Sequence, residues 1–282
     1  MLNINLRPVM AKRILAKSEV GTMRYGDCRW VDIDALDKEG VAVVCPIAAL
    51  EQHGHHLPLL TDTYLATEVA ERVEGALPDK VVLTPTLWVG ASDHHLDFPG
   101  TVSLPNSLYV EVIKNVVRCF VSAGFRRILL LNGHGGNIAP GTVAITELAN
   151  QSDEVDGLLL ALSSYWDLAG FSSETTSLET PMVSHACEYE TSMMLVVNGE
   201  TVHPEEARAG DPVIDTPFYH SELGGRATVA GRFHRLSPTG AMGSPELATP
   251  EKGEELLTLA TAEVVKFIEE FLGWDQRVVL KP

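Results

Sequence analysis

Side chains of the types that bind metal ions gather in one short segment, residues 51–62. Glu51 and His53 are two residues apart, so their side chains point the same way if the segment is extended. Asp62 closes the segment, and its two carboxylate oxygens could bridge two ions. Taken alone, Asp62 would more simply be the N-cap of a helix. Three histidines and two carboxylates within twelve residues instead indicate a metal site.

A second candidate ligand, His134, lies between glycines in residues 131–137. The glycines allow a tight turn and a close approach of the backbone to a ligand. The alternative is an ordinary strand-to-helix turn that happens to contain a histidine. Because this segment directly follows an apolar run, as residues 51–62 do, we favour His134 as a metal ligand.

The third candidate pair is His185 and Glu188, in the polar segment 184–192. If a helix begins with Ser184 as its N-cap, these two residues lie three apart on one face and can share a site. Cys187 lies off that face and is expected to pack rather than to react. The alternative is a solvated first helical turn, and the segment taken by itself does not decide between the two.

Two other segments are expected to line a substrate pocket. Residues 92–101 are polar and aromatic, and they include Ser92 and His94. Trp166 follows another strand end and could serve as a platform for a flat ligand. A tryptophan packed in the core is the alternative, and it is equally open.

Strands and helices are expected to alternate along the chain. Apolar runs at residues 41–48, 81–88, 127–131 and 157–163 predict strands, and helical periodicity covers residues 62–76, 106–123 and 250–272. Continuous hydrophobicity in the strands is typical of a parallel sheet that is covered on both faces. Ligands of such sheets bind beyond the carboxyl ends of the strands, where the candidate ligands lie.

One domain spanning residues 1–282 is expected, because no repeat, low-complexity tract or linker divides the chain. Residues 198–249 are rich in glycine and proline and have weak periodicity. This region is expected to form either a flap or a subunit contact.

The charge of the chain limits its partners. With 38 acidic and 21 basic residues, the net charge is −17, which disfavours nucleic acid and anionic membrane surfaces as partners. Four scattered cysteines without a CxxC pair, and no apolar stretch long enough for a membrane span, favour a cytoplasmic protein. The sequence contains no phosphate-binding GxxxxGK[ST] loop, HExxH helix or GxSxG elbow.

The motifs, taken in order, resemble the creatininase (creatinine amidohydrolase) family. The matching segments are residues 51–62, 132–137, 185–192 and 98–101, and the resemblance spans about residues 40–250. It implies a single-domain, three-layer α/β/α fold with a mostly parallel sheet. It also implies a homo-oligomer, with the hexamer as a common form.

The same resemblance implies a site with two divalent metal ions, usually zinc, with manganese or iron in some members. Carried over by position, the ligands are Glu51, His53, Asp62, His134 and Glu188. Asp62 would bridge the two ions, and His185 would transfer the proton.

This chain departs from the creatinine-cleaving enzymes at two places. Those enzymes have a ligand glutamate where this chain has Gly136, so the resemblance points to Glu188 as the replacement carboxylate. They also have a tryptophan where this chain has Pro181 and Met182. The resemblance therefore supports the metal centre but does not support creatinine as the substrate.

The resulting hypothesis is hydrolysis of a non-peptide C–N bond in a cyclic or small amide, by a water that two divalent ions bridge. His185 would pass the proton to the leaving nitrogen. Alternatives within the family are a formamidopyrimidine-nucleotide deformylase and a mycofactocin-type peptidase. A phosphate-bearing substrate would need basic side chains, for which the candidates are Arg208, Arg226, Arg232 and Arg235. The alternative from another class is a catalytically inactive metal-binding scaffold.

Overall fold

A five-stranded parallel sheet forms the centre of the structure, a computed structural model that describes residues 23–151, 157–209, 213–220, 224–227 and 229–274. The strand order is β1-β3-β2-β4-β5. The strands are β1 (Met23–Arg24), β2 (Ala42–Ile47), β3 (Val81–Leu83), β4 (Arg127–Asn132) and β5 (Leu159–Ser164). All four neighbouring pairs are parallel, as predicted from the apolar runs.

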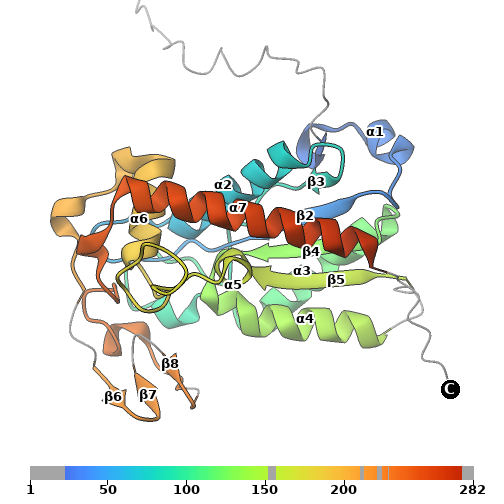
Figure 1. Ribbon diagram of the computed structural model, residues 1–282. Helices are drawn as coiled ribbons and strands as arrows, with labels where there is room; N and C mark the ends of the chain where they lie inside the picture. Colours follow the sequence, from blue (N-terminus) through green and yellow to red (C-terminus); the bar gives the residue numbers. More distant parts are fainter. Residues whose placement is uncertain (1–22, 152–156, 210–212, 221–223, 228, 275–282) are drawn as a thin grey trace, which may run out of the picture.

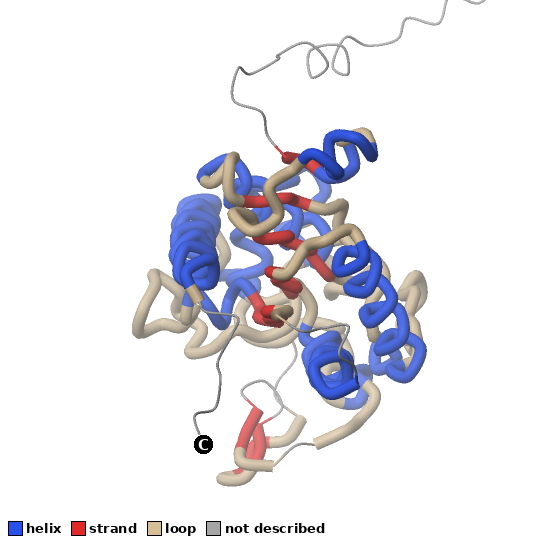
Figure 2. Tube along the Cα trace, turned by 90° about the vertical axis from the view of Figure 1, so that its right-hand side faces the viewer, coloured by secondary structure: helices blue, strands red, loops and turns tan. Residues whose placement is uncertain are grey.

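Helices cover both faces of this sheet, which gives the predicted three layers (Figures 1 and 2). The helices are α1 (Trp30–Ala35), α2 (Thr61–Ala76), α3 (Asn106–Ser122), α4 (Ile138–Gln151), α5 (Tyr165–Ala169), α6 (Glu188–Asn198) and α7 (Pro250–Gly273). One apolar core lies between the sheet and α2, α5, α6 and α7. A second core lies between the sheet and α3 and α4.

The apolar side chains explain this layering. Side chains along β2 and β4 alternate between the two cores, so strands covered on both faces read as continuous apolar runs. β5 is the edge strand, and most of its side chains are only half-buried. β3 is shorter than the predicted run at residues 81–88, because the regular ladder ends after Leu83, and the chain pairs with β2 again at the Ile47–Leu87 bridge.

Helix α4 was not predicted from the sequence. Pro140 and Gly141 lie near its beginning, and both residues are unfavourable inside helices. The first turn of a helix nevertheless tolerates proline, because the N–H groups of that turn have no partner within the helix. A Cβ at Gly141 would come within 2.9 Å of Leu162 Cδ2, so the glycine lets α4 approach β5 closely.

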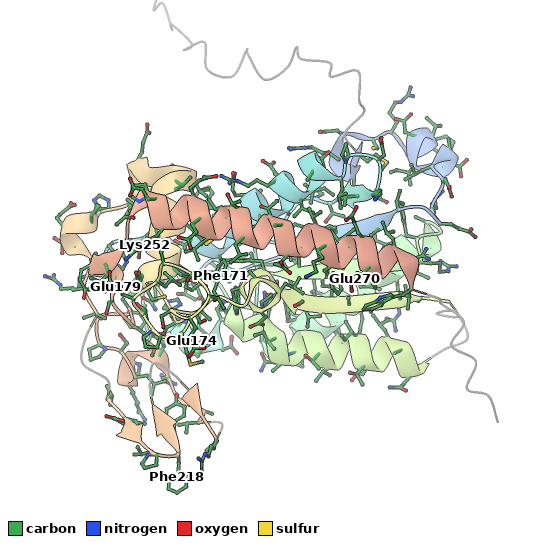
Figure 3. The ribbon with its side chains drawn as sticks, viewed as in Figure 1. Phe171, Glu174, Glu179, Phe218, Lys252 and Glu270 are labelled. Carbon is green, nitrogen blue, oxygen red and sulfur yellow. The ribbon has the colours of Figure 1, made fainter. Side chains whose placement is uncertain are left out.

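The region 198–249 contains a small antiparallel sheet of two-residue strands. These are β6 (Asp215–Thr216), β7 (Tyr219–His220) and β8 (Gly224–Gly225). They project from the main body, with Phe218 at the tip (Figures 1 and 3). None of the helices within the described ranges is long and apolar enough to cross a bilayer. Cys28, Cys45, Cys119 and Cys187 are all free thiols.

The order of the strands creates a crevice at the carboxyl ends of β2 and β4. The chain passes from β2 to β3 on one side and then returns across β2 to β4, so the loops after β2 and β4 diverge. Gly133, directly after β4, donates its N–H to Ile47 O at 2.8 Å. A Cβ at Gly133 would lie 2.7 Å from Ala66 Cβ, so this glycine lets the end of β4 approach the beginning of α2.

The packing of α7 on α6 gives a stability prediction. A Cβ at Gly253 would lie 2.0 Å from Ser192 O, so Gly253→Ala must push the helices apart and is expected to cost about 1–3 kcal/mol. Gly75 is the control, since a Cβ there meets no atom within 4 Å. Gly75→Ala is expected to gain about 0.5–1 kcal/mol, because alanine favours the helix. Urea unfolding midpoints measure both changes, and equal effects would contradict the packing argument.

Candidate metal centre

Asp62 lies between two groups of potential metal ligands at this crevice. Its Oδ2 is 3.1 Å from His134 Nδ1, and its Oδ1 is 3.0 Å from His53 Nε2. Glu51 Oε1 lies 3.2 Å from the same His134 nitrogen, and Glu190 Oε1 lies 3.9 Å from the same His53 nitrogen. The two groups are therefore Glu51–Asp62–His134 and His53–Asp62–Glu190, and they share one carboxylate.

These ligand atoms are buried and in part unsatisfied. Glu51 Oε2, His53 Nε2 and Asp62 Oδ2 have no hydrogen-bond partner although water does not reach them. Leaving such a group unpaired costs about 1–3 kcal/mol. Burial also raises the pKa of the nearby Glu190 carboxyl to about 7. Divalent cations would satisfy these atoms and neutralise the carboxylates, so the residues present fit a metal centre.

Neighbouring carbonyl groups orient both histidines toward the centre. His53 Nδ1 lies 3.1 Å from Glu51 O and donates to it, which leaves Nε2 facing Asp62. His134 Nε2 donates to Ala91 O at 3.2 Å, which leaves Nδ1 facing Glu51 and Asp62. Hydrogen bonds of this kind fix the tautomer and the ring orientation of metal-binding histidines.

The charges of the cluster favour positive charge at these nitrogens. Burial works to lower the pKa of His53, but Asp62 and Glu190 outweigh it and raise the value to about 10. For His134 as well, Glu51 and Asp62 outweigh burial and raise the pKa well above its usual range. Carboxylates placed in this way stabilise either a proton or a metal ion at the imidazole nitrogen.

Asp62 and Glu190 both occupy the first turns of helices. Asp62 is the second residue of α2, whose N-cap is Leu60, so the simpler interpretation of Asp62 as an N-cap does not apply. Glu190 is the third residue of α6. The positive end of a helix dipole favours a carboxylate at both positions.

The structure does not bring the predicted ligand Glu188 to this cluster. Its Oε1 accepts from Lys252 Nζ at 2.6 Å, and its Oε2 accepts from the N–H and the hydroxyl of Thr180, each at 2.7 Å. Lys252 also pairs with Glu179 near the beginning of α7, where Figure 3 labels both residues. Glu188 and Glu190 are two residues apart on a helix and so point in nearly opposite directions. Glu190 therefore takes the position expected of Glu188.

The expected start of this helix explains the error. The prediction placed Ser184 at the N-cap, but α6 begins at Glu188 with Cys187 as its N-cap. Ala186 has a positive φ of 49°, which turns the chain before the helix. The signal that could have identified Glu190 is a glutamate at the third helical position, where the side chain reaches back to a preceding N–H. Here Glu190 Oε2 accepts from Ala186 N.

Gly136 leaves no room for the glutamate that the creatinine-cleaving enzymes carry at this position. A Cβ there would lie 2.2 Å from Ala91 O and 2.4 Å from His134 Nε2. The structure instead places a carboxylate of another element, Glu190 of α6, beside His53 and Asp62.

His185 lies beside the cluster in a neutral form. Its Nε2 donates to Gln52 O at 2.8 Å, so Nδ1 is left as the acceptor, 3.6 Å from Glu51 Oε1. Burial and the neighbouring His53 lower the pKa of His185 to about 3. His185 thus presents an unprotonated Nδ1, a hydrogen-bond acceptor, to the site.

A cavity of about 290 Å³ opens onto these residues. Of the predicted pocket residues, Trp166 and His94 line it, whereas Ser92 does not and instead places its hydroxyl 3.1 Å from His134 Nε2. Sequence reasoning missed Phe233, which forms part of the wall. The remaining apolar lining comes from Ile138 and Val183.

His95, which also lines the cavity, was missed as well. It is buried, and its Nδ1 is 2.8 Å from Gln52 Nε2. Burial and the imidazoles around it lower the pKa of His95 far below its usual range, so this ring is neutral. His94–His95 is a doublet beside the family-like segment 98–101, which was the available signal.

No arginine or lysine is among the described residues that line the cavity. Two of the candidate phosphate ligands are engaged elsewhere, since Arg232 pairs with Asp97 at 2.8 Å and Arg208 pairs with Glu206 at 3.1 Å. Arg226 and Arg235 do not reach the cavity wall either.

Comparison with known proteins agrees with this geometry. The family model described as "Creatininase: Creatinine amidohydrolase" matches residues 26–268. A 3-dehydro-scyllo-inosose hydrolase of Thermotoga maritima is 31% identical over 84% of this chain and 76% of its own length. A mycofactocin precursor peptide peptidase of Mycobacterium tuberculosis is 30% identical over 84% and 88%, respectively.

Relatives named for creatinine are somewhat more distant in sequence. A creatinine amidohydrolase of Pseudomonas putida is 27% identical over 87% of this chain and 95% of its own length. A solved creatininase structure titled as a mutant of "Zn-Zn type" superposes with a TM-score of 0.74 at 26% identity, covering 89% of this chain and 98% of that one. With the matched family model and the buried carboxylate–imidazole cluster, these similarities show that the chain is a metal-binding hydrolase that belongs to the creatininase family.

Proposed function

We propose that this protein hydrolyses a C–N bond in a small cyclic or open amide, using two divalent metal ions. Glu51, Asp62 and His134 would hold one ion, and His53, Asp62 and Glu190 would hold the other. The observation that carries the proposal is that the two oxygens of Asp62 face different imidazoles, 3.0 and 3.1 Å away. When bound, such ions supply a water of lowered pKa and polarise the substrate carbonyl.

Zinc is the proposed native ion, with manganese or iron as alternatives. Three carboxylates and two imidazoles suit all three ions, so the ligand types do not choose among them. The "Zn-Zn type" title of the creatininase structure supports zinc.

The protein's own residues would orient the substrate and move the proton. His185 would accept a proton at Nδ1, since Nε2 carries the hydrogen that is donated to Gln52 O, and would return it to the leaving nitrogen. Trp166, Ile138 and Val183 would exclude water from one side of the substrate. The first turns of α2 and α6 favour the carboxylate forms of Asp62 and Glu190, and bound cations would offset the burial that raises the pKa of Glu190.

The lack of arginine and lysine among the described residues that line the cavity favours a neutral substrate. A phosphate group is normally bound by arginine, lysine or a helix N-terminus aimed at it, and the described lining residues include neither cationic side chain. This lack of cationic side chains weakens the alternative of a formamidopyrimidine-nucleotide deformylase. A second candidate is hydrolysis of the neutral compound after which the Thermotoga relative is named, since that relative is 31% identical. A homo-oligomer, and a hexamer in particular, stays a prediction.

Metal analysis of variants tests the ligand set. We expect Asp62→Ala to lose both ions, because each ion loses a shared carboxylate oxygen, and Glu190→Gln to lose one. Glu188→Gln is the matched control: it alters a neighbouring glutamate of the same helix, and it should keep both ions while its thermal midpoint falls. Loss of metal from the Glu188 variant, together with retention of both ions by the Glu190 variant, would overturn the assignment.

Turnover tests the chemistry. The metal-loaded protein should be screened against creatinine, small lactams, formamides, short peptides and 3-dehydro-scyllo-inosose. A chelator should abolish the activity found, and added metal should restore it. We expect His185→Ala to keep its metal and to lose about 10²–10⁴-fold in kcat, the usual contribution of a general acid–base group. A near-normal rate would remove His185 from the mechanism, and inactivity on the whole panel would favour the metal-binding scaffold.

A further inference from the structure

One wall of the cavity comes from a segment outside the metal-binding motifs. Phe233 begins a short 3-10 turn, Phe233–Arg235, and is buried at 7% exposure although the residues just before it are exposed. Its ring centroid lies 4.2 Å from that of His95 and 4.8 Å from that of His185. Phe233 therefore covers the side of the proton-transfer histidine that faces residues 198–249.

The two neighbours of Phe233 in sequence bind the same carboxylate. Arg232 Nη1 donates to Asp97 Oδ1 at 2.8 Å, and His234 Nδ1 lies 2.9 Å from Asp97 Oδ2. Asp97 belongs to residues 92–101, which also supply His94 and His95 to the cavity. One carboxylate thus brackets Phe233 from both sides and ties the late loop to the loop that follows β3.

We propose that Asp97, Arg232 and His234 form a clasp, named here the Asp97 clasp, that seats Phe233 over His185 and thereby limits the size of the substrate. The proposal rests on the proposed function only for its substrate readout. For residues 198–249, where either a flap or a subunit contact was expected, the proposal favours a flap. The part around Phe233 would then cover the active site of the same chain.

Two properties of the clasp support this role. Its side chains are partly exposed, with 67% for Arg232, 39% for His234 and 28% for Asp97, so water and salt weaken the pairing and the clasp can open. With the clasp closed, the cavity of about 290 Å³ is at the lower end of ordinary ligand pockets, which span about 300–1,000 Å³. A small ring fits such a space, whereas a peptide needs Phe233 to move.

Hydrogen exchange tests the clasp without any substrate. Asp97→Asn keeps the size of the side chain and removes its charge, and we expect faster amide exchange at residues 229–237 with unchanged metal content. Glu206→Gln is the matched control, since it breaks the Arg208–Glu206 pair of the same region at 3.1 Å but should leave that exchange unchanged. High salt should raise exchange in the unaltered protein to the Asp97→Asn level and change the variant little.

If Asp97→Asn does not fold, Arg232→Gln and the salt series on the unaltered protein test the same clasp. Unchanged exchange at residues 229–237 in both arms would overturn the clasp itself. Inactivity on every amide, with exchange altered as expected, would instead overturn the proposed function and leave the clasp standing.

Kinetics test the limit on substrate size. On amides that the protein cleaves, Asp97→Asn should raise KM for a small cyclic amide several-fold with little change in kcat. It should also increase the kcat/KM of a longer amide relative to that of the small one. Phe233→Ala should shift this ratio in the same direction, Phe233→Leu should shift it less, and Glu206→Gln should not shift it. A ratio that stays constant in Asp97→Asn, despite faster exchange, would show that the clasp does not select for size.

Discussion

The buried carboxylate of Asp62, which two groups of side chains share, has to be compensated by its surroundings. Asp62 is 2% exposed, and its two oxygens face His53 and His134 at 3.0 and 3.1 Å. Charge at such a site is costly unless it is compensated. The compensation comes from the first turn of α2, from the two imidazoles and, in the proposed enzyme, from two cations. Glu51 and Glu190 extend the same arrangement to either side, so four other side chains depend on the placement of Asp62.

The sheet brings these side chains together. Because β2 and β4 are adjacent although β3 separates them in sequence, the loops that follow them leave the same edge of the sheet in different directions. Gly133 then lets the end of β4 approach α2 closely enough for His134 to reach Asp62. The carbonyl groups of Glu51 and Ala91 accept hydrogen bonds from the two imidazoles. These bonds leave His53 Nε2 and His134 Nδ1 facing Asp62.

Two features of this site determine the space offered to a substrate. The crowded backbone around Gly136 excludes a glutamate there, and α6 supplies Glu190 instead. The cavity wall contains Phe233 from the late loop as well as Trp166, and no arginine or lysine is among its described lining residues. Through the first feature, the carboxylate beside His53 and Asp62 comes from helix α6. The second feature sets the shape of the cavity, and function is decided by such local sites rather than by the fold.

The sequence by itself determined whatever depends on neighbours along the chain. Continuous apolar runs predicted β2, β4 and β5, helical periodicity predicted α2, α3 and α7, and the density of ligating types identified Glu51, His53, Asp62 and His134. Only the tertiary structure decided between Glu188 and Glu190, because the phase of α6 depends on where the helix begins. That start is set by the turn at Ala186 and by the contacts of Glu188 with Thr180 and Lys252. The role of Phe233 could not be predicted from the sequence either. Its sequence neighbours Arg232 and His234 bind Asp97, which lies 136 residues before Phe233, and no pattern near Phe233 in the sequence indicates these contacts.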